Sequence, residues 1–347
     1  MCIYLIEKDG LHYDSADHIM PAGLGGIKKL PLDFVSREFN RLSSTLEQAL
    51  MRDSIISLPR QIMGPGKRGS LDGSKETKSK INVFKQQGEN GGFSLGYIQK
   101  GKPYEIPHIT FNTKTGAYGV GMNAASTDED IELFKIKLLK FDSLKIRMIE
   151  HTELDDTCIF GVTLDKNDEN CYIASKDGKT HPLNGNLLQE IAKILTDRSI
   201  FSSKSDIKVK THQSSTMGES YDRCCAKIAF NCLAHFKRKE FVLQDCFNPI
   251  RNWIVDGGEN NFVTLLPPDE NLKKLFPEDS HRVIITKVKN AIVADVCLYN
   301  HFRHSVILAS DFGGTIEFDG FICDWKNKVE YTYYEYFLKQ QVVPEEL

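Results

Sequence analysis

Apolar residues recur at helical spacing in several stretches of the chain. Within residues 37–53 they fall at i, i+4, i+7 and i+8, on one helix face, and no Gly or Pro interrupts the range. The residues of this face are Leu42, Leu46, Ala49 and Leu50. The same kind of pattern predicts three further helices, over residues 128–141, 186–197 and 219–236.

Short apolar runs bounded by turn residues predict strands elsewhere. They are expected near residues 3–6, 17–20, 106–112, 117–122, 145–150, 158–164 and 206–212. Residues 281–335 hold five further β-rich runs, the pattern of an antiparallel meander. The fold class that we predict is therefore α+β, with an antiparallel sheet at the C-terminal end.

Charged side chains on the predicted helices are expected to face solvent. Glu47 is the first example, although its place on helix 37–53 also makes it a candidate metal ligand. Arg223 and Lys227 lie away from the apolar face of helix 219–236 and could form a basic patch, but a solvated face is favoured. The cysteines of that helix, at positions 224, 225 and 232, are expected to pack in the core.

Composition sets wide limits on the class of protein. The chain has 347 residues, of which 41% are hydrophobic and 26% charged, as in ordinary globular proteins. Its length suggests two or three domains. The formal charge of −3 leaves no global basic field, so any contact with nucleic acid must come from local patches.

Cysteine usage and hydropathy suggest a cellular compartment. Nine cysteines occur without a CxxC pair, and the number is odd. Because no signal peptide precedes them and no apolar run approaches the length of a membrane span, we expect reduced thiols in a soluble, cytoplasmic protein with no membrane partner.

A basic segment separates the N-terminal region from the rest. Residues 64–80 carry five Lys or Arg against two acidic residues, and are rich in Gly and Ser. We therefore expect a module at 1–60, a flexible linker at 61–105 and a mixed α+β domain at 106–347. The linker is interpreted as a solvated loop or, alternatively, as an arm whose Lys67 and Arg68 contact phosphates.

The densest chemistry lies around the dipeptide Asp17-His18. On a strand the two side chains point to opposite sides of the backbone. A neutral imidazole with a pKa of about 6.5 suits a general base at cytosolic pH. The Asp17 carboxylate and the Asn40 carbonyl oxygen are ligands that Mg²⁺ prefers. Such a cation can stabilise the leaving 3′-oxygen when a phosphodiester bond is cleaved.

Asp17-His18, the following Leu24-Gly25-Gly26 and Asn40 resemble the core of the HNH (His-Me finger, ββα-metal) nucleases, over roughly residues 1–55. The resemblance implies a small N-terminal ββα-metal finger. Asp17 and Asn40 would bind Mg²⁺ or Mn²⁺, and His18 would act as general base. Arg37 or Arg41, beside Asn40, would brace a phosphate. The two glycines would let the loop between strand and helix turn tightly.

The chain departs from this family at two places. Many relatives with the Leu-Gly-Gly variant bind a structural zinc through two CxxC pairs; the corresponding positions here are Cys2, Leu5, Ser36 and Phe39. One cysteine cannot complete a tetrahedral site, so we expect no structural zinc, and an apolar core of Leu5, Phe34 and Phe39 instead. The middle Asn, which orients the base in that family, would fall near Pro31 here, which has no donor.

Two functions from different classes follow from the resemblance. The first is a metal-dependent DNA endonuclease, as in bacterial restriction or anti-phage effectors, with the C-terminal domain choosing a target, partner or trigger. The second is a degenerate finger that has lost turnover and serves nucleic-acid binding or complex scaffolding. A weaker idea is a ligand-sensing C-terminal domain. Cleavage of both strands makes a homodimer plausible.

Overall fold

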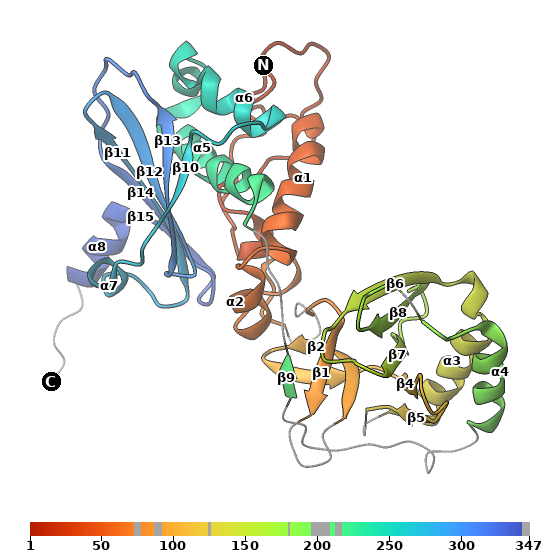
Figure 1. Cartoon of the computed structure of the whole chain (residues 1–347). Coiled ribbons are helices and arrows are strands. Elements are labelled where there is room, and N and C mark those ends of the chain that lie inside the picture. The colour runs from red at the N-terminus through yellow and green to blue at the C-terminus, as the bar shows by residue number, and fades with distance from the viewer. Residues whose placement is uncertain are drawn as a thin grey trace, which may run out of the picture. The chain divides into compact units, whose positions relative to one another are not determined.

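The chain folds into two compact units, one of which is inserted into the sequence of the other. A computed structural model describes residues 1–72, 78–86, 92–123, 126–179, 181–195, 209–211 and 217–341. The split unit consists of Met1–Thr77 and Ser215–Leu347, and the inserted unit of Lys78–Ser214 (Figure 1). Each unit has its own hydrophobic core.

The inserted unit contains two sheets and two helices among its described residues. The first sheet has the order β3-β2-β1-β9 and comprises β1 (Asn82–Gln86), β2 (Phe93–Gln99), β3 (Lys102–Glu105) and β9 (Val209–Thr211). The second has the order β5-β4-β7-β8-β6 and comprises β4 (His108–Asn112), β5 (Tyr118–Gly121), β6 (Lys145–Glu150), β7 (Thr157–Val162) and β8 (Asn170–Ser175). Helices α3 (Asp128–Leu139) and α4 (Gly185–Ile194) pack against each other and share a core with the second sheet.

The split unit is built on a six-stranded antiparallel sheet of order β10-β13-β12-β11-β14-β15. Its strands are β10 (Val263–Leu266), β11 (Ser280–Val288), β12 (Ala291–Leu298), β13 (Phe302–Ala309), β14 (Asp319–Asp324) and β15 (Val329–Thr332). The predicted antiparallel sheet is confirmed, but it is not a simple meander, because β14 pairs with β11 rather than with β13. The shorter helices of this part are α6 (Asn248–Asp256), α7 (Glu270–Lys273) and α8 (Tyr333–Gln341).

Helix α5 (Glu219–Val242) joins the sheet to the N-terminal region. One side of it packs on β10–β13, and another packs on α1 (Arg37–Arg52), as Figure 1 shows. Every residue from 224 to 234 is buried, which is the pattern of a helix covered on all sides. The prediction that Cys224, Cys225 and Cys232 belong to the core is confirmed.

The predicted domain boundaries need correction. Residues 1–60 form no separate module, because the apolar residues of α1 belong to one core with α5 and the C-terminal sheet. Such a short segment buries too little surface alone, so the C-terminal half completes its core. The range 61–105 is not a linker: it begins with the last two residues of α2 (Ser57–Ile62) and ends with β1–β3, while residues 73–77 and 87–91 lie outside the described part.

Residues 64–66, just after α2, are hydrogen-bonded to their surroundings. Arg60 is buried and donates to the carbonyl oxygens of Gly23 and Gly66. The Tyr299 hydroxyl donates to the Gly64 carbonyl over 2.9 Å. These bonds tie residues 64–66 to the N-terminal loop and to the sheet.

The strands expected nearest the Asp-His motif are not formed. Residues 3–6 make no ladder, and residues 17–20 contribute only one antiparallel bridge, between His18 and Lys29. The α+β class holds, whereas the ββα finger stays a prediction. Within the described residues no helix combines the length and apolar character that a bilayer crossing requires.

Candidate functional site

The first turn of helix α1 is hydrogen-bonded to the segment that precedes Asp17. Ser36 caps the helix, since its Oγ accepts a hydrogen bond from the Phe39 amide. Asn40, in the first turn, donates from Nδ2 to the carbonyl oxygen and to the Oγ of Ser15, at 3.2 and 3.3 Å. Its Oδ1 is buried and has no hydrogen-bond donor among the described residues.

The loop that carries Asp17 and His18 returns on itself. The Ile19 amide donates to the Lys28 carbonyl and the Leu30 amide to the Asp17 carbonyl, on either side of the His18–Lys29 bridge. The predicted need for glycine in this turn is confirmed at both positions. Gly25 has φ +94°, and a Cβ on Gly26 would lie 1.7 Å from the Met20 carbonyl oxygen.

Asp17 is held by three donors. Its Oδ1 accepts the His18 amide at 2.9 Å. Its Oδ2 lies 2.7 Å from Nζ of Lys227 and accepts Nδ2 of Asn231 at 2.9 Å. The side chain is 10% exposed, so these contacts are largely shielded from water.

Lys227 joins this carboxylate to a second one. Its Nζ also lies 2.8 Å from Oε1 of Glu47, and its side chain is only 1% exposed. Burial by itself would lower the pKa of Lys227, but the Asp17 and Glu47 carboxylates outweigh it and hold the pKa well above its ordinary value. The expectation that Glu47 and Lys227 are solvated charges is therefore wrong. Both face inward because α1 packs on α5.

Asn231, one helical turn after Lys227, completes a buried polar network. It donates to the His18 carbonyl over 2.9 Å as well as to Asp17. Its Oδ1 accepts the Tyr4 hydroxyl at 2.6 Å. The network therefore satisfies both ends of the buried Asn231 amide.

The His18 imidazole is half-buried beside these charges. Burial, the largest cause, lowers its pKa, and Lys29 adds to this effect, whereas Asp17 opposes it. The ring is therefore neutral at pH 7, the state that a general base requires. Among the described residues no hydrogen bond orients the ring.

The predicted phosphate-contacting residues are exposed, but their surroundings differ. Arg37 forms an ion pair with Asp14 at 2.8 Å. Lys67 and Arg68 lie in the short 3-10 helix Lys67–Gly69, which contacts the Ala22–Leu24 turn of the Asp-His loop. Arg41 follows Asn40 on α1.

Apolar side chains pack around the buried Cys2. Leu5, Phe34 and Phe39 are all buried, so the predicted apolar core is confirmed. Tyr4 stacks on Phe39 with nearly parallel rings. The Cys2 thiol is buried too, and its sulfur accepts the Ser36 amide at 3.4 Å.

Only one of the two predicted metal ligands is available to a divalent cation. The orphaned Oδ1 of Asn40 is an acceptor that a cation could use. Asp17 does not fit as it stands, because the Lys227 ammonium already occupies its Oδ2 and would repel a second cation. No group of three or more His, Cys, Asp or Glu with metal-ligand geometry occurs in the part of the chain that the structure describes.

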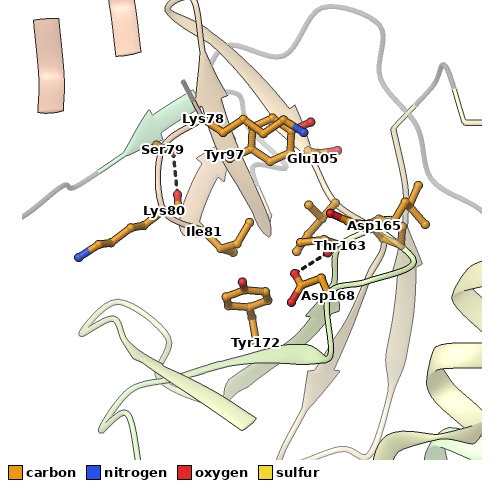
Figure 2. A pocket seen from close by; sticks show the side chains of 13 residues that line it. Lys78, Ser79, Lys80, Ile81, Tyr97, Glu105, Thr163, Asp165, Asp168 and Tyr172 are labelled. Carbon is orange, nitrogen blue, oxygen red and sulfur yellow. Dashed lines mark hydrogen bonds between the residues drawn. The ribbon is translucent and has the colours of Figure 1, made fainter. Parts of the chain in front are cut away.

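The inserted unit has a pocket of its own, of about 530 Å³. Figure 2 shows its lining, with Lys78 beside Tyr97 and with Thr163 hydrogen-bonded to Asp168. The Lys78 ammonium lies 4.6 Å from the centroid of the Tyr97 ring. A small ligand with an aromatic or polar group suits such a lining, but the pocket holds none of the predicted site residues.

Sequence reasoning missed Lys227, Asn231 and Tyr4 as members of the site. A hint was present: Lys227 and Asn231 are spaced i, i+4 in a helix whose other central residues are nearly all apolar. Polar side chains in such a helix need buried partners.

Comparisons with protein-family models, with curated proteins and with solved structures give no match to this chain.

Proposed function

We propose that the chain is a DNA endonuclease that hydrolyses phosphodiester bonds, with His18 as general base. The observation that carries the proposal is the partly exposed His18 imidazole next to Asp17, on a loop to which Asn40 is hydrogen-bonded; burial lowers the pKa of this imidazole. These are the residue types, in the relative order, that the resemblance to HNH nucleases requires.

Hydrolysis of a phosphodiester bond needs a group that accepts a proton from water and positive charge beside the phosphate. A nitrogen of His18 takes a proton from water, whose oxygen attacks phosphorus while the bond to the leaving 3′-oxygen breaks. His18 then carries the proton as imidazolium and returns it to solvent, and the leaving 3′-oxygen takes a proton from solvent to become a hydroxyl. The exposed cations Arg41, Lys67 and Arg68 would bind the flanking phosphates.

Mg²⁺ or Mn²⁺ belongs to this proposal as a cofactor, with Asn40 as the ligand whose geometry fits. It would supply charge for the transition state and the leaving oxygen. Because Lys227 occupies Asp17, we derive no step through the cation. A restriction or anti-phage role and a homodimer also belong to the proposal and rest on the resemblance alone.

One observation favours the second candidate, a finger without turnover that binds nucleic acid or scaffolds a complex. The buried Lys227 ammonium neutralises the carboxylate that would otherwise bind metal. An exposed nucleic-acid-binding surface around Lys67 and Arg68 would remain in such a protein.

The test compares the wild type, His18→Ala and His301→Ala on supercoiled plasmid in 5–10 mM Mg²⁺ or Mn²⁺. His301 is an exposed histidine of the same unit and serves as the matched control. We expect nicking by the wild type and by His301→Ala, and a loss of about 100-fold or more in His18→Ala, the range for a general base. Equal nicking by all three proteins would overturn the proposal. Equal DNA retardation without nicking would favour the second candidate.

A further inference from the structure

Two carboxylates from separate segments converge on one nitrogen in the split unit. Asp17 comes from the N-terminal loop and Glu47 from α1, and Nζ of Lys227 reaches both from α5 at 2.7 and 2.8 Å. A divalent cation bound to Asp17 would have to lie within a few ångströms of this nitrogen. The ammonium and such a cation therefore exclude each other.

Lys227 cannot easily leave this position. Its side chain is 1% exposed, and its neighbours along α5, Ala226 and Ile228, are fully buried. Withdrawing the ammonium would leave it without an anion in the core and would open the contact between α1 and α5. The lysine is thus a fixed part of the site rather than a mobile surface charge.

We infer that Lys227 is a built-in cation that takes the place of a divalent ion at Asp17 and suppresses divalent-ion binding there. The inference deepens the proposed function and rests on it for the identity of the site. If Lys227 is removed, the carboxylates of Asp17 and Glu47 become available as oxygen ligands for a hard cation.

The first test measures Mn²⁺ binding to the full-length protein by titration calorimetry and by electron paramagnetic resonance. All proteins carry His18→Ala, so that the result does not depend on catalysis. We expect Lys227→Met to bind one Mn²⁺ at least about tenfold more tightly than its parent, a change of one decade in Kd. Adding Asp17→Asn should abolish the gain. Equal affinity with and without Lys227, or a folded Lys227→Met protein without Asp17-dependent binding, would overturn the inference.

A second measurement covers the case in which Lys227→Met does not fold. In the wild type, the ¹⁵N resonance of a buried, paired ammonium is followed by NMR during addition of Mg²⁺. We expect the Lys227 signal to stay unchanged up to 10 mM Mg²⁺, and its displacement at that concentration would contradict the inference. If His18-dependent nicking is absent while both binding results hold, the proposed function fails and the inference stands.

Discussion

The Lys227 ammonium lies 2.7 Å from Oδ2 of Asp17, and this ion pair links the two sequence segments of the split unit. Its shared partner Glu47 extends the contact onto α1. The pair therefore contributes to the packing of α1 on α5 as well as to the charge of the candidate site.

Truncation of Lys227 should destabilise the protein strongly. Lys227→Ala leaves two inward-facing carboxylates without their cation, so we expect the free energy of unfolding to fall by about 3–5 kcal/mol. Urea denaturation measures the change. Lys326→Ala, which breaks the more exposed pair with Asp279, is the control and should have little effect. Equal losses in both variants would show that burial of the Lys227 pair is not the cause.

Tyr4 should stabilise the fold through its hydroxyl as well as its ring. Tyr4→Phe keeps the stacking on Phe39 but leaves Oδ1 of Asn231 without its donor. We expect a loss of about 1–2 kcal/mol in the free energy of unfolding. Tyr334→Phe, at an exposed ring on α8, should change nothing measurable. Unchanged stability in Tyr4→Phe would mean that the Asn231 network is dispensable.

His281 should make stability fall in acid. Its Nδ1 accepts the Tyr299 amide, so Nε2 carries the hydrogen donated to the Leu24 carbonyl, and burial lowers the pKa to about 3. Below the unfolded pKa of about 6.5 the unfolded chain binds a proton that the folded chain does not, at a cost approaching about 1.4 kcal/mol per pH unit. This loss of stability is absent above a pH of about 6.5 and stops growing below the folded pKa of about 3.

The test is the pH dependence of stability in His281→Gln beside His301→Gln, which changes an exposed histidine. The free energy of unfolding should decline less between pH 6.5 and 4 in His281→Gln than in the wild type. His301→Gln should show the same decline as the wild type. An identical pH slope in wild type and His281→Gln would refute this assignment.

A fragment of residues 1–60 should not fold alone. Its core residues, such as Phe39 and Leu46, share one cluster with Phe230 and Leu233 of α5. We expect circular dichroism of the fragment to show no cooperative thermal transition. Residues 78–214, which have their own contacts, serve as the comparison and should melt cooperatively. Cooperative melting of the 1–60 fragment would restore the separate module expected from sequence.

The elements with strong periodicity could be predicted from the sequence. Helix α1 was expected over 37–53 and forms over Arg37–Arg52; the helix expected over 219–236 forms too, and α5 extends to Val242 only across a kink at Arg238, whose φ is 72°. Residues 3–6 misled because their apolar side chains pack in the core rather than in a sheet: Tyr4 stacks on Phe39. The basic composition of residues 64–80 obscured the strands that follow, of which β1 pairs with the distant β9 as well as with its neighbour β2.

For the candidate site, the residue types and their loop could be predicted, but not their partners. Asp17, His18 and Asn40 lie close together in the sequence, and Asn40 hydrogen-bonds Ser15 from the first turn of α1. Lys227 comes from α5, and only the packing of α5 on α1 decides which way it points. A local pattern holds no information on such a contact, so a buried charge was taken for a solvated one.

The pH dependence of plasmid nicking tests the central claim, that neutral His18 activates water, most directly. Burial lowers the His18 pKa, so the base is already deprotonated at pH 7. We predict that the nicking rate rises with an inflection below the ordinary histidine value of about 6.5 and is flat from pH 7 to 8. The rise should be missing from the residual activity of His18→Ala. A rate that climbs steadily from pH 7 to 9, or the same profile in wild type and His18→Ala, would contradict the account.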